Sequence, residues 1–500
     1  MRNRDLAFLV LTLLASIAAA LLVAHSAWGV PGEWQWQHRQ AGALADMRWW
    51  MATAPALALI AFSLWLLRRA RAGRRVSGAW SLVFVLLAFA LQLSTLAMAP
   101  ASTAYAGAVI LSPVATTYFG EAGKVGNMRE FLGDYANRMR TFGRHAQTYP
   151  PGPIVLFWAV RGAVERSPVV FGLGAGLITA VTGLGIPDIA GRYARVSGHS
   201  VAPPEAVAAI IAAWLLGILG CLSIIPIYLL ARGRWGGAAA ICAAALAAAV
   251  PSLILFTPSI LQLVALETAL TLYLFDLAWS RRSAWWAAAA GAMWAVSALT
   301  SLAMLAVPPL LVVWGIAMHF ATPRDQQPPG PAWRVICPWI VASLAVFGLA
   351  YLLAGIDFPA IMKSALAAHR EVTTRSFART YSRWLGWNLF DFWMFLGAAL
   401  GLWLLRQMWA DIASALRGDM AAVTPLLWAV ALTIAALDIS GVVRAEVGRI
   451  WMFLMLPAAA AMGRFVASRP QPEMTLGVIL AAQLLQISAF ERHLALLVVW

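Results

Sequence analysis

The chain has 500 residues, of which 62% are hydrophobic and 11% charged, and its mean hydropathy is +0.77. Soluble domains carry about a quarter of their residues as charged side chains, so this composition excludes an ordinary soluble enzyme. The formal net charge of +15 lies in loops between apolar stretches, which excludes nucleic-acid binding as its meaning. The sequence predicts an all-α fold, that of a polytopic helical membrane protein.

Apolar stretches of about 20 residues, long enough to cross a bilayer, follow one another along the chain. They predict about 13 transmembrane helices, near residues 6–28, 50–67, 79–99, 205–231, 237–257, 259–280, 283–300, 302–320, 335–354, 387–405, 422–437, 449–468 and 475–490. The first stretch follows Arg2 and Arg4, but it is longer than the core of about 7–15 residues in a signal peptide. We therefore expect it to be a retained anchor.

Clusters of arginine in three short linkers, at 68–75, 232–234 and 281–282, predict the orientation. The positive-inside rule places these linkers and the N-terminus in the cytoplasm of a cell inner or plasma membrane. The segments then expected outside are 29–49, 100–204, 355–386 and 438–448. Within them, 153–164 and 168–186 are expected to be juxtamembrane helices at the interface. The predicted regions are an N-terminal hairpin (1–78), a core (79–320) and a C-terminal region (321–500).

The first long outer segment, 112–153, is polar and contains the carboxylates Glu121 and Asp134. Apolar residues at helical spacing predict an amphipathic helix over 128–142 on the membrane. After His145, the segment ends in Tyr149-Pro150-Pro151-Gly152-Pro153. Paired prolines cannot continue a helix, so this elbow is expected to be a rigid turn into the helix at 154–164.

The second outer segment contains His369 and Arg370, followed by Arg375, Arg379 and Arg383. A spacing of four places the last three arginines on one face of a helix, where like charges repel by a few tenths of a kcal/mol. A bound anion would offset that repulsion, so we expect these arginines to bind phosphate. The alternative is an interfacial helix whose arginines reach the lipid headgroups.

The third outer segment contains Glu446 and Arg449, three residues apart, at the mouth of the span 449–468. This spacing predicts a local ion pair, and charge at a span mouth tends to face the bundle interior. A binding site and a purely structural pair are both open here. Tryptophans of the segment 29–50 are interpreted as an aromatic belt. Glu267, within a span, is either a functional carboxylate or a neutral acid bonded to a neighbour.

The order of these features resembles a known superfamily. A polar outer loop with carboxylates closes on the elbow, a span ends in Tyr228-Leu-Leu-Ala-Arg232, and a helix pair bends at Phe256-Thr-Pro258. This order is similar to the glycosyltransferase C superfamily, in particular to bacterial relatives of protein O-mannosyltransferases and to the lipid A aminoarabinose transferases. The resemblance covers about residues 79–320, and 355–468 only by its outer arginines, while 1–67 look like an added hairpin.

The resemblance implies an inverting glycosyltransferase that takes a sugar from a polyprenyl-phosphate donor on the extracytoplasmic face. In such enzymes an outer-loop carboxylate is the base, which points to Glu121, with Asp134 as substitute. The residues that it suggests for substrate and phosphate are Tyr118, His145, Tyr149, Arg370, Arg375, Arg379, Arg383, Glu446 and Arg449. The chain departs from the family where Tyr149 replaces the elbow histidine and where 112–119 lack an Asp-Glu pair.

No cofactor is expected. A divalent metal stays open, since carboxylates are present although no cluster of ligands is evident in the sequence. The expected partners are the lipid donor, membrane lipids, and a glycan, lipid or protein acceptor. Two other functions stay open. One is a polyprenyl-linked glycan ligase or polymerase that would use outer arginines with His145 and His369. The other is a transporter or flippase of an anionic lipid-linked substrate, which predicts broken spans and internal repeats.

Overall fold

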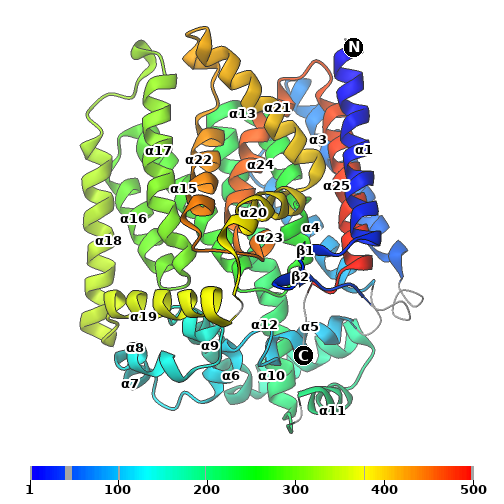
Figure 1. Cartoon of the computed structure of the whole chain (residues 1–500), viewed down its shortest axis with the longest axis vertical. Helices are drawn as coiled ribbons and strands as arrows, with labels where there is room; N and C mark the ends of the chain where they lie inside the picture. Colours follow the sequence, from blue (N-terminus) through cyan, green and yellow to red (C-terminus); the bar gives the residue numbers. More distant parts are fainter. Residues whose placement is uncertain (1–2, 40–47, 99–101, 198, 377, 497–500) are drawn as a thin grey trace.

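The computed structural model describes residues 3–39, 48–98, 102–197, 199–376 and 378–496. Long helices stand side by side, with α1 at one edge and α18 at the other (Figure 1). They are α1 (Asn3–His25), α3 (Thr53–Arg71), α4 (Trp80–Leu96), α12 (Pro203–Leu222), α13 (Ile224–Ala248), α15 (Leu261–Arg281), α16 (Ala284–Ala298), α17 (Val307–Ala321), α18 (Trp333–Ala354), α21 (Ala398–Leu416), α22 (Pro425–Ser440), α24 (Met452–Ala467) and α25 (Pro472–His493). The all-α membrane fold is confirmed.

Seven helices among the described residues are long and apolar enough to cross a membrane, or nine if each of two bent pairs is one span. The helices α4, α22 and α24 are apolar but shorter. Every predicted stretch overlaps a helix, whereas the total of about 13 stays a prediction. The stretch Pro203–Ala248 leaves helical geometry at Gly236 (φ 84°), next to the linker that the sequence predicts.

One predicted span is sharply bent. The stretch 387–405 is not continuous, because α20 (Tyr381–Leu396) and α21 meet at an angle of 111°. Gly397 stands at the break with φ 105°. A Cβ there would lie 2.7 Å from the Nε2 of Gln483, which donates hydrogen bonds to the backbone carbonyls of Ala249 and Leu396. Glycine is the residue that tolerates both conditions, so hydropathy alone could not reveal the break.

Small residues let the central helices approach closely. A Cβ added at Gly463 in α24 would lie 2.6 Å from Ala243 in α13. In the same way, a Cβ at Gly291 in α16 would lie 2.2 Å from the carbonyl oxygen of Trp339 in α18. The core of the bundle is therefore packed backbone against backbone, and it gives the loops at its ends a rigid base.

The arginine-bearing linkers gather at one end of the bundle. Tyr228 donates a hydrogen bond to the carbonyl of Ser77 (3.1 Å), and Arg71 pairs with Glu473 (2.9 Å). The short helices of the first outer segment form the opposite end, at the bottom of Figure 1, with α19 (Phe358–Glu371) just above them. They are α6 (Tyr118–Gly123), α7 (Met128–Gly133), α8 (Tyr135–Arg138), α9 (Gly152–Arg166), α10 (Pro168–Thr182) and α11 (Ile186–Ser197).

One expectation for the outer segments needs correction. The amphipathic helix predicted over 128–142 is broken into α7, α8 and a 3-10 turn, because Gly133 and Asp134 end the first piece. Its apolar residues Phe131, Tyr135 and Met139 are nevertheless buried together. The helices α9 and α10, predicted at the interface, meet at an angle of 99°.

The tryptophans of the segment 29–50 are only partly a belt. Trp49 and Trp50 are exposed, but Trp36 is buried in a hairpin of β1 (Trp28–Val30) and β2 (Trp34–Trp36). Its Nε1 donates to the Oδ1 of Asp391 in α20 at 2.8 Å. The hairpin is therefore part of the interior of the protein.

Candidate functional site

A cavity of about 1350 Å³ lies between the outer segments and the ends of the helices beneath them. Its polar wall comes from segments far apart in the sequence. The charged and polar residues that line it are Glu33, Gln35, Gln37, Thr116, Tyr118, Arg144, His145, Thr148, Tyr149, Ser259, Ser301, His369, Thr373, Arg379, Thr433, Ser440, Glu446 and Arg449. The structure thus brings together the first, second and third outer segments on one hollow.

The elbow places Tyr149 in this wall. Gly152 donates its backbone N–H to the carbonyl of Leu299 (2.8 Å), and a Cβ there would lie 2.7 Å from the same oxygen. Only glycine allows so close an approach, and it fixes the elbow on the end of α16. The rings of Tyr149 and Tyr118 then meet edge to face at 5.2 Å. Burial raises the pKa of both phenols, so they remain neutral hydroxyl groups at neutral pH.

The segment 441–449 holds Glu446 in an unusual backbone conformation. Ala445 (φ 75°) and Glu446 (φ 59°) are both left-handed, which costs about 1–3 kcal/mol for each non-glycine residue. The side chain of Asn388 accepts from the backbone N of Ala445 at 3.1 Å, and Asp391 accepts from the N of Gly448 at 2.7 Å. Two buried groups of α20 therefore stabilise the turn, as expected where strain serves a site.

Glu446 forms a double ion pair. Its Oε2 pairs with Arg449, which confirms the predicted local pair, and its Oε1 pairs with Arg379 at 3.4 Å. Burial alone would raise the pKa of Glu446, but the charges of Arg449 and Arg379 outweigh it and hold that pKa below 4.5. Two guanidinium groups share one carboxylate, and the Nε of Arg449 is buried with no hydrogen-bond partner among the described residues. The arrangement favours an anion in the cavity.

Arg379 reaches the cavity from a turn and not from a helix. After α19 the chain makes a π-helical turn at Val372–Ser376, and Ala378 is left-handed (φ 46°) before α20 begins. Arg379 is 8% exposed, and its Nη1 donates to the carbonyl of Arg444. The expectation that Arg375, Arg379 and Arg383 share one helical face was therefore wrong, because the helix ends between them.

The other predicted arginines lie elsewhere. Arg375 is exposed and pairs with Glu371 at 3.2 Å. Arg383 pairs with Glu33 at 3.3 Å, with most of its side chain in solvent. Arg370 is exposed near the end of α19. None of these three is among the residues that line the cavity.

Two histidines line the cavity, and each donates a hydrogen bond through one ring nitrogen. The Nε2 of His145 lies 3.0 Å from the carbonyl of Val114, and the Nε2 of His369 lies 2.8 Å from the carbonyl of Val442. A carbonyl oxygen only accepts, so Nε2 carries the proton and Nδ1 carries the lone pair in the neutral ring. Burial, and for His145 also the charge of Arg449, lowers the pKa of both below 6.5. Both are therefore neutral bases at neutral pH.

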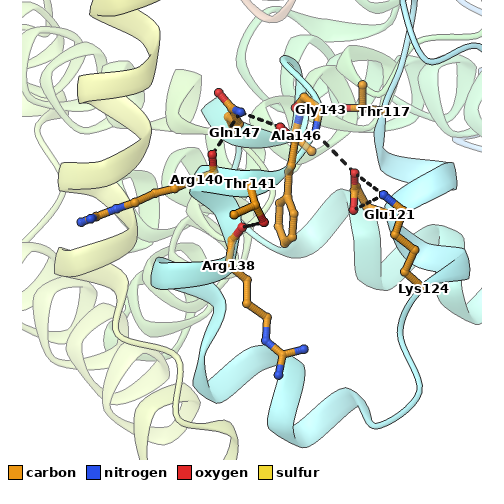
Figure 2. Close-up of polar contacts among 10 residues, drawn as sticks. Thr117, Glu121, Lys124, Arg138, Arg140, Thr141, Gly143, Ala146 and Gln147 are labelled. Atoms are coloured by element: carbon orange, nitrogen blue, oxygen red, sulfur yellow. Dashed lines mark hydrogen bonds and ion pairs between the residues drawn. The ribbon is translucent and has the colours of Figure 1, made fainter.

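Glu121 forms polar contacts within the first outer segment, as Figure 2 shows. Its carboxylate accepts from Lys124 Nζ (3.0 Å) and from the backbone N of Gly143 (3.3 Å). Thr117 accepts from the backbone N of Ala146 at 2.7 Å beside it. These bonds fix the turn that carries His145. Glu121 itself is not among the cavity-lining residues.

Asp134 is also away from the cavity. About half of its side chain is exposed (48%), and it pairs with Arg138 at 3.0 Å. Hydrogen bonds from Asn137 and Arg138 lower its pKa below 3.8, which makes it a weak base. The geometry therefore gives neither carboxylate contact with a bound substrate.

Apolar residues form the rest of the cavity, between the spans. They are contributed mainly by α17, α22 and the turn before α17, and include Leu305, Pro309, Val313, Leu432, Ala436 and Leu437. Leu432 and Ala436 are exposed residues of α22, and both line the cavity. The polar and apolar parts belong to one continuous cavity, which suits a ligand with an anionic head and a hydrocarbon tail.

Two charged lining residues were not among the site candidates predicted from the sequence: Arg144 and Glu33. The alternation of tryptophans around Pro31-Gly32 is a hairpin signal that could have revealed the strand pair carrying Glu33. It could not have shown what Glu33 contacts. Within the described residues, no group of three or more histidine, cysteine and acidic side chains could hold a metal ion.

Glu267 is buried in α15, and its Oε1 accepts a hydrogen bond from Thr300 at 2.8 Å. Thr300 precedes Ser301, which lines the cavity. The bonded-neighbour interpretation of Glu267 therefore agrees with the structure, and the residue is adjacent to the cavity wall without forming part of it.

Comparison with known proteins gives two matches of low similarity. No protein-family model matches the chain, and no curated protein sequence does. A crystal structure of the Archaeoglobus fulgidus oligosaccharyltransferase with Zn and sulfate is 18% identical, covers 67% of this chain and 48% of its own, and has a TM-score of 0.39. The archaeal oligosaccharyltransferase AglB of that organism, with an inhibitory peptide and a dolichol-phosphate, is 15% identical over 81% of this chain and 56% of its own, with a TM-score of 0.38.

The chain therefore spans about half the length of these solved structures. Both are oligosaccharyltransferases. With TM-scores below 0.5, the matches report a resemblance and assign no role to any residue of this chain.

Proposed function

We propose that the chain is a membrane glycosyltransferase that takes a sugar from a polyprenyl-phosphate lipid. One observation carries the proposal: a single cavity joins a wall of arginine, tyrosine and histidine to an apolar branch between α17 and α22. A phosphate-linked sugar would lie against the polar wall while its lipid chain occupies the branch. The cavity lies at the end opposite the arginine-rich linkers, which supports an extracytoplasmic site by the positive-inside rule.

The reaction requires a cationic group for the leaving phosphate and a base for the acceptor hydroxyl. An acceptor hydroxyl attacks the anomeric carbon, the bond from that carbon to the phosphate oxygen breaks, and the lipid phosphate leaves as an anion. Attack from the face opposite the leaving group inverts the anomeric centre. Arg379 and Arg449 would stabilise the charge that develops on the phosphate, and a base takes the hydroxyl proton. The neutral hydroxyls of Tyr118 and Tyr149 would donate hydrogen bonds to the same phosphate or to the sugar.

His145 is the base that the geometry favours. Its Nδ1 carries a lone pair and the ring lines the cavity, whereas Glu121 already accepts from Lys124 and Gly143. General-base assistance contributes about 10²–10⁴-fold to rate. Glu121 and Asp134 as bases stay predictions of the sequence, which the comparison of variants below tests.

A polyprenyl-linked glycan ligase is the second candidate. Both carboxylates that line the cavity, Glu33 and Glu446, are ion-paired, and the ligase would use the arginines and histidines of the same wall. Polyprenyl-linked oligosaccharides tested beside single-sugar donors distinguish the two, because the ligase would consume only the former.

The experiment uses the purified chain in lipid nanodiscs with a panel of polyprenyl-phosphate sugars, and it measures release of free polyprenyl phosphate. Release from one donor, lost in Arg379→Ala and retained in Arg375→Ala, supports the proposal. If no polyprenyl phosphate binds to the parent chain, the proposal is wrong.

A further inference from the structure

Glu33, at the tip of the N-terminal hairpin, contacts the segment that carries Arg379. We infer that Glu33 is a positioning residue for Arg379. The β1–β2 hairpin lies within residues 1–67, which looked like an addition to the core, and through Glu33 it completes the anion site. The inference rests on the proposed function. It concerns how the arginine is held, and not whether Glu33 itself takes part in the reaction.

The contacts of Glu33 are numerous for one side chain. Its Oε2 accepts from the backbone N of Thr380 (2.8 Å) and from Nε1 of Trp384 (2.8 Å), and its Oε1 accepts from Arg383 (3.3 Å). The side chain is 8% exposed. All three donors belong to 380–384, more than 340 residues away in sequence. The carboxylate thus sits at the N-terminus of α20, where helix geometry favours negative charge.

The residue next to Thr380 is Arg379, whose backbone carbonyl accepts from Arg444. Its N–H donates to the carbonyl of Thr373 at 3.2 Å, and Ala378 before it is left-handed. A left-handed alanine relaxes to a commoner conformation unless its neighbours prevent it. Glu33 holds the following residue from the hairpin side, while the carbonyl of Arg444 receives the guanidinium from the other side.

A second property of Glu33 fits this role. Burial raises its pKa, but the hydrogen bonds of Thr380 and Trp384 and the charge of Arg383 outweigh that effect and lower it below 4.5. The carboxylate is therefore charged at neutral pH. Since Arg383 already pairs with it, Glu33 does not compete with a bound phosphate as strongly as a free carboxylate in the cavity would.

The test measures binding of undecaprenyl phosphate to the chain in nanodiscs, for Glu33→Ala, Glu33→Gln, Arg379→Ala and the double variant Glu33→Ala/Arg379→Ala. We expect Glu33→Ala to weaken binding about tenfold, since it leaves buried donors without an acceptor and releases the segment. Once Arg379 is absent, Glu33→Ala should add less than about twofold, because residues that act as one unit are not additive.

Glu33→Gln is the conservative variant. The amide oxygen can still accept from Thr380 and Trp384, while the NH₂ group faces Arg383, so binding should fall by less than in Glu33→Ala. Glu473→Ala is the matched control: Glu473 also pairs with an arginine, Arg71, but at the other end of the bundle. It should leave binding unchanged.

Hydrogen exchange of residues 373–384 is measured in parallel, and it should quicken in Glu33→Ala but not in Glu473→Ala. Parent-like binding in Glu33→Ala, or a loss that adds in full to that of Arg379→Ala, would overturn the inference. If Arg379→Ala binds as the parent does, the phosphate role in the proposed function fails. In that case unchanged exchange in Glu33→Ala separately overturns the positioning role, and quickened exchange supports it.

Discussion

Replacing Arg449 by alanine is the sharpest test of the anion site. The side chain is 21% exposed, one nitrogen pairs with Glu446, and the buried Nε has no hydrogen-bond partner among the described residues. A bound phosphate would supply an acceptor for that nitrogen. A hydrogen bond that involves a charged group contributes about 1.5–3 kcal/mol, which corresponds to about 10- to 150-fold in Kd.

The assay is equilibrium binding of undecaprenyl phosphate to the chain in nanodiscs at fixed ionic strength, because screening weakens such contacts as salt rises. Arg375→Ala is the control, since Arg375 is exposed and pairs with Glu371 outside the cavity. Arg449→Ala should bind about 10- to 150-fold more weakly, and Arg375→Ala as the parent. Equal binding by the two variants would refute the assignment of the anion to the Glu446 pair.

The same change predicts a compensation. Without Arg449, Glu446 keeps only Arg379, at 3.4 Å, and a buried carboxylate with weak pairing is costly. Adding Glu446→Gln to Arg449→Ala should therefore raise the melting temperature again without restoring phosphate binding. A double variant no more stable than Arg449→Ala alone would show that the charge of Glu446 is solvated by other means.

Three further predictions concern the base and the lipid branch. His145→Gln should reduce turnover about 10²–10⁴-fold. The parent should lose activity only as pH falls below 6.5, where the lowered pKa of His145 lets the ring protonate; an unchanged acid limb in the variant would exclude His145 as the titrating group. Glu121→Gln should lower the melting temperature by a few degrees, about 1–2 kcal/mol of lost stability, with turnover almost unchanged. A hundredfold loss of turnover without a thermal shift would instead favour Glu121 as the base. Ala436→Trp fills the apolar branch and should raise KM for a long polyprenyl donor but not for a short-chain analogue, so an equal effect on both would show that the tail lies elsewhere.

Hydropathy placed the apolar helices because a membrane span needs about 20 apolar residues, a requirement visible in local sequence, but it did not reveal the break at Gly397. The pair Glu446–Arg449 was predictable for a related reason: both partners lie within one turn of chain. Contacts set by tertiary structure were not. The four-residue spacing of Arg375, Arg379 and Arg383 implies one face only if the helix continues, and the π-helical turn and left-handed Ala378 end it.

The identity of the catalytic base also depends on tertiary contacts that the sequence does not reveal. Glu121 had the right chemistry in the right segment, but the backbone N of Gly143, brought over it by the turn, takes one of its oxygens. The two histidines were visible in the sequence without any indication of which nitrogen is protonated. That property depends on the carbonyls of Val114 and Val442, which only the folded chain places there.

Arg379 and Arg444 each donate to the main-chain carbonyl of the other, and His369 adds a bond from α19 to Val442. The second and third outer segments are thereby fastened to one another along their length. Neither segment can move away from the cavity without breaking hydrogen bonds to the other. The two segments would therefore move together. Under the proposed function, a lipid donor would enter the apolar part of the cavity without that motion, because α17 and α22 flank it.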